Sequence, residues 1–290
     1  AAAVYSWTGM GRQLGRHHEE KSPIFNPGAE EKISSLRKDK MMAIIDFDRT
    51  ISSKESVECH HMVGTSNVMP KEFLQKFTIL IDNPKITGQL WWDLAHGLML
   101  EYQLSEQQID EIVAKEDHCI PRPGMRDLLA LLEKEEIPVL IVSAGLQDVI
   151  ERILAKWGFQ FKNARVVSNK MVFDSEGKIK NFTEPQITSR NKRLTYERNI
   201  AFFDHHIDRK QFLIIGDSPR DADIKDDIPI ERGTCITIGF NDGLKSWATD
   251  AQYEEKYDAI IRDGEAGLIV ARLQEAFDRK AVSAAERSFV

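Results

Sequence analysis

The stretch from residue 42 to residue 52, M-A-I-I-D-F-D-R-T-I-S, constrains the fold of this chain most. Its first part, Ala43–Ile45, is short, apolar and β-prone, which is typical of a strand buried on both faces of a parallel sheet. Asp46 and Asp48 follow, and side chains two residues apart on an extended chain point the same way. Two carboxylates this close repel each other unless a cation such as Mg²⁺ lies between them. An isolated D-x-D motif is also compatible with a solvated turn, so the choice between a metal site and a turn depends on the rest of the chain.

Short apolar runs and amphipathic segments alternate along most of the chain. This alternation predicts an α/β fold with a parallel sheet and right-handed crossovers. A polar turn at 174–177 predicts a β-hairpin within residues 171–182. The other expected strands are 138–142, 165–167, 211–215, 235–238 and 259–261, and the helices expected between and after them are 125–135, 146–157, 191–203 and 265–277.

Residues 55–118 interrupt this alternation, because they contain helical patterns and no strand-like run. We therefore expect a small helical cap domain at 55–118, inserted into a core domain made of residues 41–54 and 119–290. The last of its helices opens with S-x-x-Q, which is a capping-box signature. The expected cap helices are 71–81, 87–103 and 105–117.

The first 40 residues contain two prolines and a mixed charge run, which predict a loose N-terminal arm with one helix near residues 30–38. The first 18 residues carry two arginines and no acid. A processed targeting segment is therefore one interpretation of the arm, and a disordered tail is the other.

The composition restricts the class of partner. The chain has 39 Lys and Arg against 46 Asp and Glu, a net charge of −7, and no long basic run. This balance argues against nucleic acid or an anionic membrane surface as the main partner. No apolar run approaches the roughly 20 residues that cross a bilayer. We expect a small phosphate ester as partner, and a protein that is a monomer or a weak homo-oligomer.

The cysteines Cys59, Cys119 and Cys235 are far apart and form no C-x-x-C pair. This pattern predicts free thiols in a reducing compartment, which is the cytoplasm unless the arm directs the protein to an organelle. Cys59 stands beside His60 and His61 as a candidate metal set, but no second cluster completes the four ligands of a zinc site.

Polar side chains follow three of the expected strands. Ligands bind at the carboxyl ends of the strands in open α/β sheets. The second strand runs into S-A-G at 143–145 and then a helix, so a hydroxyl and backbone N–H groups can face an anion. A later strand ends in G-D-S-P-R-D at 216–221, and Lys192 precedes it. Together with the first pair of aspartates, these residues contain a nucleophile, a metal site and phosphate donors.

The order D-F-D-x-T, S-A-G, a lone Lys and G-D-S-x-x-D resembles the haloacid dehalogenase superfamily, and within it the cytosolic pyrimidine 5′-nucleotidase (type III) family. I-V-S-A-G-L-Q-D at 141–148, V-V-S-N-K-M-V-F-D at 166–174 and H-G-L at 96–98 are similar to segments of that family. The resemblance covers about residues 42–277. It implies a Rossmann-like core, with a parallel sheet flanked by helices and a small C1-type helical cap.

The resemblance also implies a role for each residue. Asp46 would be the nucleophile that forms an aspartyl-phosphate, and Asp48 the general acid and base. Mg²⁺ would be held by Asp46, by the Asp48 carbonyl and by Asp217. The implied phosphate-binding residues are Ser143, Ala144, Gly145 and Lys192, and the implied supporting residues are Thr50 and Asp221.

Some of these assignments have alternatives. Lys192 lies in a basic cluster, so Arg190 and Arg193 compete for its role, and Thr50 could be a turn residue only. His205 and His206 are most simply surface residues. The candidate substrate-pocket residues are Trp91, Trp92, Ala95 and His96, of which the tryptophans could instead form cap core and the histidine could be an interior residue.

The sequence departs from the family pattern in the expected cap. The family reads the base with a cap glutamate, and Leu80 or Ile81 takes its place here, unless Asp82 replaces it. An apolar pocket discriminates between substrates by only about 1–3 kcal/mol. As the resemblance implies, we expect a Mg²⁺-dependent 5′-nucleotidase for pyrimidine nucleoside 5′-monophosphates, and three alternatives stay open. These are a phosphatase for a sugar or cofactor phosphate, a catalytically idle binding subunit, and transfer of the phosphoryl group to a nucleoside.

Overall fold

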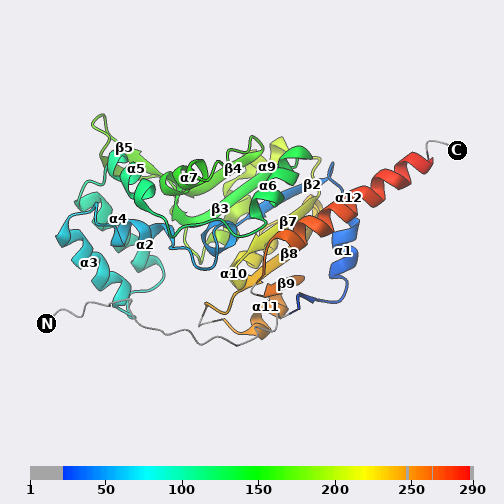
Figure 1. Cartoon of the computed structure of the whole chain (residues 1–290), viewed down its shortest axis with the longest axis horizontal. Coiled ribbons are helices and arrows are strands. Elements are labelled where there is room, and N and C mark those ends of the chain that lie inside the picture. The colour runs from blue at the N-terminus through cyan, green and yellow to red at the C-terminus, as the bar shows by residue number, and fades with distance from the viewer. Residues whose placement is uncertain (1–21, 246–247, 263, 288–290) are drawn as a thin grey trace.

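The computed structural model describes residues 22–245, 248–262 and 264–287, with residues 280–287 described by their backbone alone. Among these residues, a seven-stranded sheet has the strand order β1-β9-β8-β7-β2-β3-β4 (Figure 1). Neighbouring strands are parallel except β1, which pairs with β9 in the antiparallel direction. The strands are β1 (Ile24–Phe25), β2 (Met41–Ile45), β3 (Val139–Leu146), β4 (Ala164–Asn169), β7 (Gln211–Gly216), β8 (Thr234–Asn241) and β9 (Ala259–Arg262).

Strand β2 is buried on both faces of the sheet, as its apolar sequence predicts. Ala43 and Ile45 belong to the larger hydrophobic cluster, while Met42 and Ile44 belong to a second cluster on the opposite face. This alternation follows from the two-residue period of a strand. The predicted mixed α/β fold with a mostly parallel sheet is thus confirmed, and each expected strand is present.

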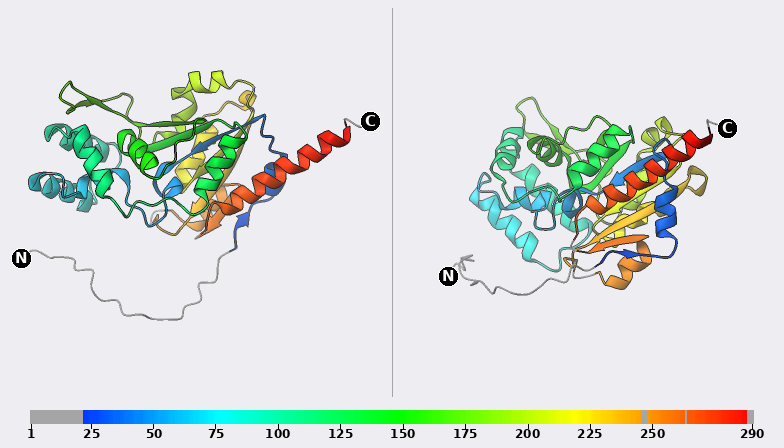
Figure 2. Two further views of the ribbon diagram at one scale, coloured as in Figure 1. Left: turned by 45° about the horizontal axis from the view of Figure 1, so that its top comes forward. Right: turned by 45° about the vertical axis from the view of Figure 1, so that its right-hand side comes forward.

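Helices cover both faces of the sheet. Leu128 of α6, Ile150 of α7 and Leu273 of α12 pack in the larger cluster, and Phe203 of α9 packs in the second. Figure 2 shows α12 running across one side of the sheet. The helices of this part are α1 (Ala29–Ser35), α6 (Met125–Lys134), α7 (Gln147–Lys156), α8 (Thr195–Arg198), α9 (Ile200–His205), α10 (Pro219–Ala222), α11 (Asp250–Lys256) and α12 (Gly267–Arg287).

Four helices follow β2 and lie at one end of the molecule (Figure 1). They are α2 (Cys59–Thr65), α3 (Lys71–Asp82), α4 (Gln89–Glu101) and α5 (Glu106–Lys115). The predicted capping box is present, because the Ser105 side chain accepts from the Gln108 N–H and the Gln108 side chain from the Ser105 N–H. We propose that these helices form the cap domain at 55–118. No helix of the described residues combines the length and apolarity that a membrane span requires.

A β-hairpin from the second half of the chain touches the cap helices. Its strands are β5 (Met171–Phe173) and β6 (Ile179–Phe182). The Ile179 N–H donates to the Leu104 carbonyl at 2.9 Å, and the Glu106 N–H donates to the Gly177 carbonyl at 2.9 Å. The helices are therefore bonded to the hairpin through the backbone, in addition to their two chain connections with the sheet.

Some segments differ from expectation, and the helices α2 and α11 were not expected. The helix expected at 191–203 is divided into a 3₁₀ turn, α8 and α9, because Asn199 leaves the helical conformation with φ −125° and its side chain donates to the Thr195 carbonyl. The helix expected near residues 30–38 is present as α1, but residues 24–35 do not form a loose arm, because β1 pairs with β9 and α1 buries Ala29 and Ile33. The part of the expected arm at 1–21 lies outside the described residues.

Candidate active site

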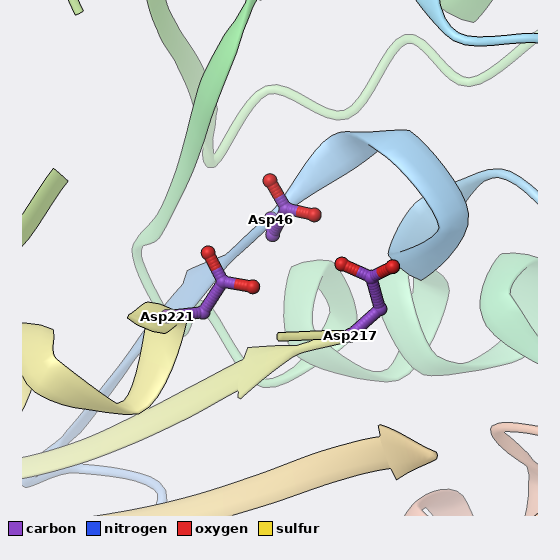
Figure 3. A group of neighbouring side chains, drawn as sticks. All are labelled: Asp46, Asp217 and Asp221. Atoms are coloured by element: carbon purple, nitrogen blue, oxygen red, sulfur yellow. The ribbon is translucent and has the colours of Figure 1, made fainter. Parts of the chain in front are cut away.

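Three aspartate side chains converge at the carboxyl ends of β2 and β7 (Figure 3). Asp46 follows β2, Asp217 follows β7, and Asp221 lies in the short helix α10 after it. One carboxylate oxygen from each lies within 4.8 Å of the others, and all three residues are buried. Three carboxylates at this spacing suit a cation that prefers oxygen ligands.

Asp46 is held in place by two hydrogen bonds of different kinds. The Thr50 hydroxyl donates to Oδ2 of Asp46 at 3.0 Å, and the Lys192 ammonium donates to Oδ1. Burial raises the pKa of Asp46 to about 7, although the nearby Lys192 charge opposes the rise. Thr50 is fully buried, so it orients the carboxylate without contact with solvent.

Lys192 also bonds to Asp221. Its Nζ lies 2.9 Å from Oδ1 of Asp221, and the side chain is buried, whereas Arg190 and Arg193 are exposed. Burial alone would lower the pKa of Lys192, but the carboxylates of Asp221 and Asp46 outweigh burial and raise it. Of the three candidate cations in this basic cluster, the structure brings Lys192 to the aspartates.

Glycine is required before the Asp217 turn because another side chain approaches it closely. A Cβ built on Gly216 would lie 2.3 Å from Cβ of Asp221. The other oxygen of Asp221, Oδ2, accepts from the Ser218 N–H at 3.1 Å. The G-D-S-x-x-D sequence therefore folds Asp221 back onto the strand end, beside Asp217.

Lys245 is a second lysine at the site, and the sequence analysis did not identify it. Its Nζ lies 3.0 Å from Oδ2 of Asp217, and burial raises the pKa of Asp217 to about 6 against the opposing effect of Lys245. Lys245 follows β8, so its position after a fourth strand end was the available signal. When all three carboxylates are ionised, the two ammonium groups leave a net charge of −1, which favours an additional cation.

Asp48 lies in a tight turn after β2, where Arg49 adopts φ +59°. Burial raises the pKa of Asp48 to about 7, and the carboxylates of Glu58 and Asp46 add to the rise. The thiol and the N–H of Cys59 both donate to Asp48. Cys59, which the sequence offered as a metal ligand, is not part of the cluster formed by Asp46, Asp217 and Asp221.

Arg122 holds the turn that contains Asp48 in place. Its buried guanidinium donates to the Thr50 carbonyl at 3.1 Å and to the Arg49 carbonyl, and it pairs with Asp242 at 2.7 Å. The sequence analysis did not identify Arg122, because nothing in a single arginine after Pro121 marks it as buried.

The S-A-G segment closes one side of the site. The Gly145 N–H donates to the Ser143 hydroxyl at 2.9 Å, and the Ala144 carbonyl accepts from the Trp92 indole at 3.0 Å. Asn169 also donates to the Ala144 and Gly145 carbonyls. These bonds fix the orientation of the peptide groups of this segment, which borders the same cavity as the aspartates.

A cavity of about 360 Å³ connects the aspartates with the cap helices. A larger cavity of about 740 Å³ lies along β4 and contains none of the acidic site residues. We consider the smaller one to be the active-site cavity, because the clustered aspartates and Lys192 line it. Its walls include the predicted residues Asp46, Asp48, Trp91, Trp92, Ser143, Ala144, Gly145, Lys192, Asp217 and Asp221.

Two of the candidate pocket residues lie behind the cavity wall. Ala95 and His96 are buried and are not among the lining residues. His96 contacts the lining residue His60 through their Nε2 atoms at 3.1 Å. Burial lowers the pKa of His96 to about 4, so the ring is neutral near pH 7.

The chain is similar in sequence to known proteins. The family described as "Pyrimidine 5'-nucleotidase (UMPH-1)" matches residues 44–277. The 7-methylguanosine phosphate-specific 5′-nucleotidase of Gallus gallus is 28% identical over 246 residues, which are 78% of this chain and 84% of that protein. The Homo sapiens protein of the same name is 26% identical over 263 residues, with 82% and 86% covered.

Solved structures share the fold. Cytosolic 5′-nucleotidase IIIB bound to cytidine has a TM-score of 0.74 at 22% identity, over 88% of this chain and 93% of the other. A probable phosphoserine phosphatase from Vibrio cholerae has a TM-score of 0.59 at 14% identity, with 84% and 67% covered. The sheet and helices described above are therefore those of this group of phosphatases.

Proposed function

The chain belongs to the pyrimidine 5′-nucleotidase (UMPH-1) family, and from this premise we propose that it hydrolyses nucleoside 5′-monophosphates, with Asp46 as nucleophile and Mg²⁺ as cofactor. It is a phosphomonoester hydrolase, as its relatives and its fold indicate. The substrate, the metal and the residue roles are the proposal.

The observation that carries the proposal is the position of Asp46. Its carboxylate lies at a strand end, is oriented by Thr50, and faces a cavity that also contains Lys192. A carboxylate that attacks phosphorus forms a covalent aspartyl-phosphate, which divides one difficult step into two easier ones. Lys192 offsets the negative charge that develops on the phosphoryl oxygens.

Asp48 supplies the proton. It lies two residues after the nucleophile and borders the same cavity. A raised pKa near 7 suits a group that must give and take a proton near neutral pH. Asp48 therefore protonates the leaving nucleoside oxygen, and it later takes a proton from the water that cleaves the intermediate.

The donor set fits Mg²⁺. The three carboxylates are oxygen ligands at close spacing, and the two lysines leave one negative charge uncompensated. Asp46, Asp217 and the Asp48 carbonyl would hold the ion, with Asp221 next to them. When bound, Mg²⁺ supplies positive charge that stabilises the phosphoryl oxygens.

The cavity walls suggest which leaving groups to test. Trp91 and Trp92 line the cavity together with the Glu58 carboxylate. Aromatic faces and a carboxylate attract cations, and a base methylated on N7 of guanine is a cation. 7-Methylguanosine 5′-monophosphate is therefore a second candidate substrate beside the pyrimidine nucleotides, in keeping with the names of the relatives.

Phosphate release by the purified protein tests the proposal. The substrates are CMP, UMP, 7-methylguanosine 5′-monophosphate and a sugar phosphate, each with Mg²⁺ and after chelation with EDTA. We expect Mg²⁺-dependent turnover that is faster for nucleotides, and none for Asp46→Asn, which keeps the size of the side chain. Equal turnover of the sugar phosphate would favour the broader phosphatase, and no release from any ester would favour an idle binding subunit.

The covalent step has its own assay. Acid quenching during turnover of a ³²P-labelled nucleotide should leave label on the wild-type protein and none on Asp46→Asn. Added nucleoside that becomes labelled would show transfer of the phosphoryl group in addition to hydrolysis. Full activity in Asp46→Asn would contradict the mechanism.

A further inference from the structure

Cys59 makes two contacts with one oxygen of Asp48. Its backbone N–H donates to Oδ1 at 3.2 Å, and its Sγ lies 3.3 Å from the same atom. The Cys59 side chain is fully buried. A cysteine thiol ordinarily keeps its proton near pH 7, and at this distance from a carboxylate oxygen it acts as the donor.

The second oxygen of Asp48 faces a different neighbour. A Cβ built on Gly145 would lie 3.1 Å from Oδ2 of Asp48, 3.1 Å from Oγ of Ser143 and 3.2 Å from Cβ of Cys59. Oδ2 is thus directed toward the S-A-G segment, where the phosphoryl group is expected. The missing side chain at Gly145 leaves room for this arrangement.

A protonated carboxyl group has one donor oxygen and one acceptor oxygen. Because Cys59 offers two donors to Oδ1, its backbone N–H and its S–H, that oxygen must be the acceptor. The transferable proton then resides on Oδ2, on the side of the reacting group.

We propose that Cys59 is a positioning residue for the acid–base step, in that it fixes which oxygen of Asp48 carries the proton. The inference rests on the proposed function, and it adds a residue that does not touch the substrate. It also gives a role to the Cys59 thiol, which the sequence offered only as a candidate metal ligand.

In the first half of the reaction, an oxygen of Asp46 forms a bond to phosphorus. The bond between phosphorus and the nucleoside O5′ breaks, and its electron pair goes to O5′. The proton on Oδ2 of Asp48 passes to O5′. In the second half, water attacks phosphorus, its proton returns to Oδ2, and the Asp46 carboxylate is released.

A comparison of two leaving groups tests the role. A nucleoside alkoxide needs a proton as it departs, whereas p-nitrophenolate leaves without one. The value of kcat/KM reports steps up to the departure of the leaving group and excludes hydrolysis of the intermediate. In Cys59→Ala, we expect kcat/KM for the nucleotide to fall about tenfold more than kcat/KM for p-nitrophenyl phosphate, which is the effect of about one lost hydrogen bond.

Two variants complete the test. Cys59→Ser keeps a donor and should restore most of the lost discrimination between the two esters. Cys119→Ala removes another buried thiol and should leave the ratio of the two kcat/KM values unchanged. If Cys59→Ala does not fold, Cys59→Val fills the space without a donor and takes its place.

If a folded variant loses kcat/KM equally for both esters, so that their ratio stays at the wild-type value, the role of Cys59 would be overturned. A wild-type protein that hydrolyses neither ester would instead reject the proposed function, so the two failures are distinguishable.

Discussion

Replacement of Arg122 by methionine should destabilise the protein and slow catalysis together. The guanidinium and the Asp242 carboxylate are 2% and 4% exposed, and the N–O distance between them is 2.7 Å. Removal of one partner from a buried ion pair costs about 3–5 kcal/mol, because the remaining charge is left uncompensated. Arg122 also donates to the Arg49 and Thr50 carbonyls, so its loss frees the turn that carries Asp48.

Urea unfolding followed by circular dichroism measures the first effect, and thermal unfolding should show a decrease of roughly 10 °C in Tm. A double-mutant cycle with Asp242→Asn isolates the pair, with an expected coupling of about 1–3 kcal/mol. Arg37→Met removes the exposed pair with Asp39 and should change the unfolding free energy little.

Loss of Arg122 should also lower activity. A turn that has lost two carbonyl contacts should lower kcat about tenfold, at a temperature where the variant is folded. A loss below about 1 kcal/mol in Arg122→Met, or additive effects of Arg122→Met and Asp242→Asn, would refute the account.

Three further predictions concern the site and its surroundings. Lys192→Met should lower kcat about 100-fold or more at saturating Mg²⁺, as measured by phosphate release, and a loss below threefold would exclude a role in charge stabilisation. Gly216→Ala should fold less stably and lose activity, because the new Cβ collides with Asp221; wild-type unfolding and turnover would contradict the close packing. Because His96 has a folded pKa of about 4, below its unfolded value, its contribution to stability is constant above about pH 6.5 and falls by about 3 kcal/mol toward pH 4. Unfolding measured across this range should show a shallower acid decline in His96→Leu, and an unchanged decline would reject the buried neutral ring.

The sheet and the aspartates were predictable from local patterns. Strand β2 has apolar residues on both faces, and Asp46 follows it directly, so strand identity and site position come from a few neighbouring residues. Asp217 could be placed in the same way after β7. The carboxyl ends of neighbouring parallel strands meet at one edge, which brings such residues together without further information.

Other site residues depend on tertiary structure. Lys192 could be chosen over Arg190 and Arg193 by resemblance, but its burial between two carboxylates is a property of the folded chain. Lys245 and Cys59 act through contacts with residues that are 28 and 11 positions away. No local pattern encodes such pairs. The break at Asn199 likewise reflects a side-chain bond that outweighs helix propensity.

The backbone bonds between the hairpin and the cap helices limit how a substrate can enter. A body anchored at two separate places rotates only about the line that joins them, so wide opening would require the Leu104 and Gly177 carbonyls to lose their partners. The segment between α3 and α4 also borders the cavity, through Ile86, Thr87 and Gly88. We expect substitutions in this loop to change the rate of product release, because it lies on the cavity wall outside the aspartate cluster.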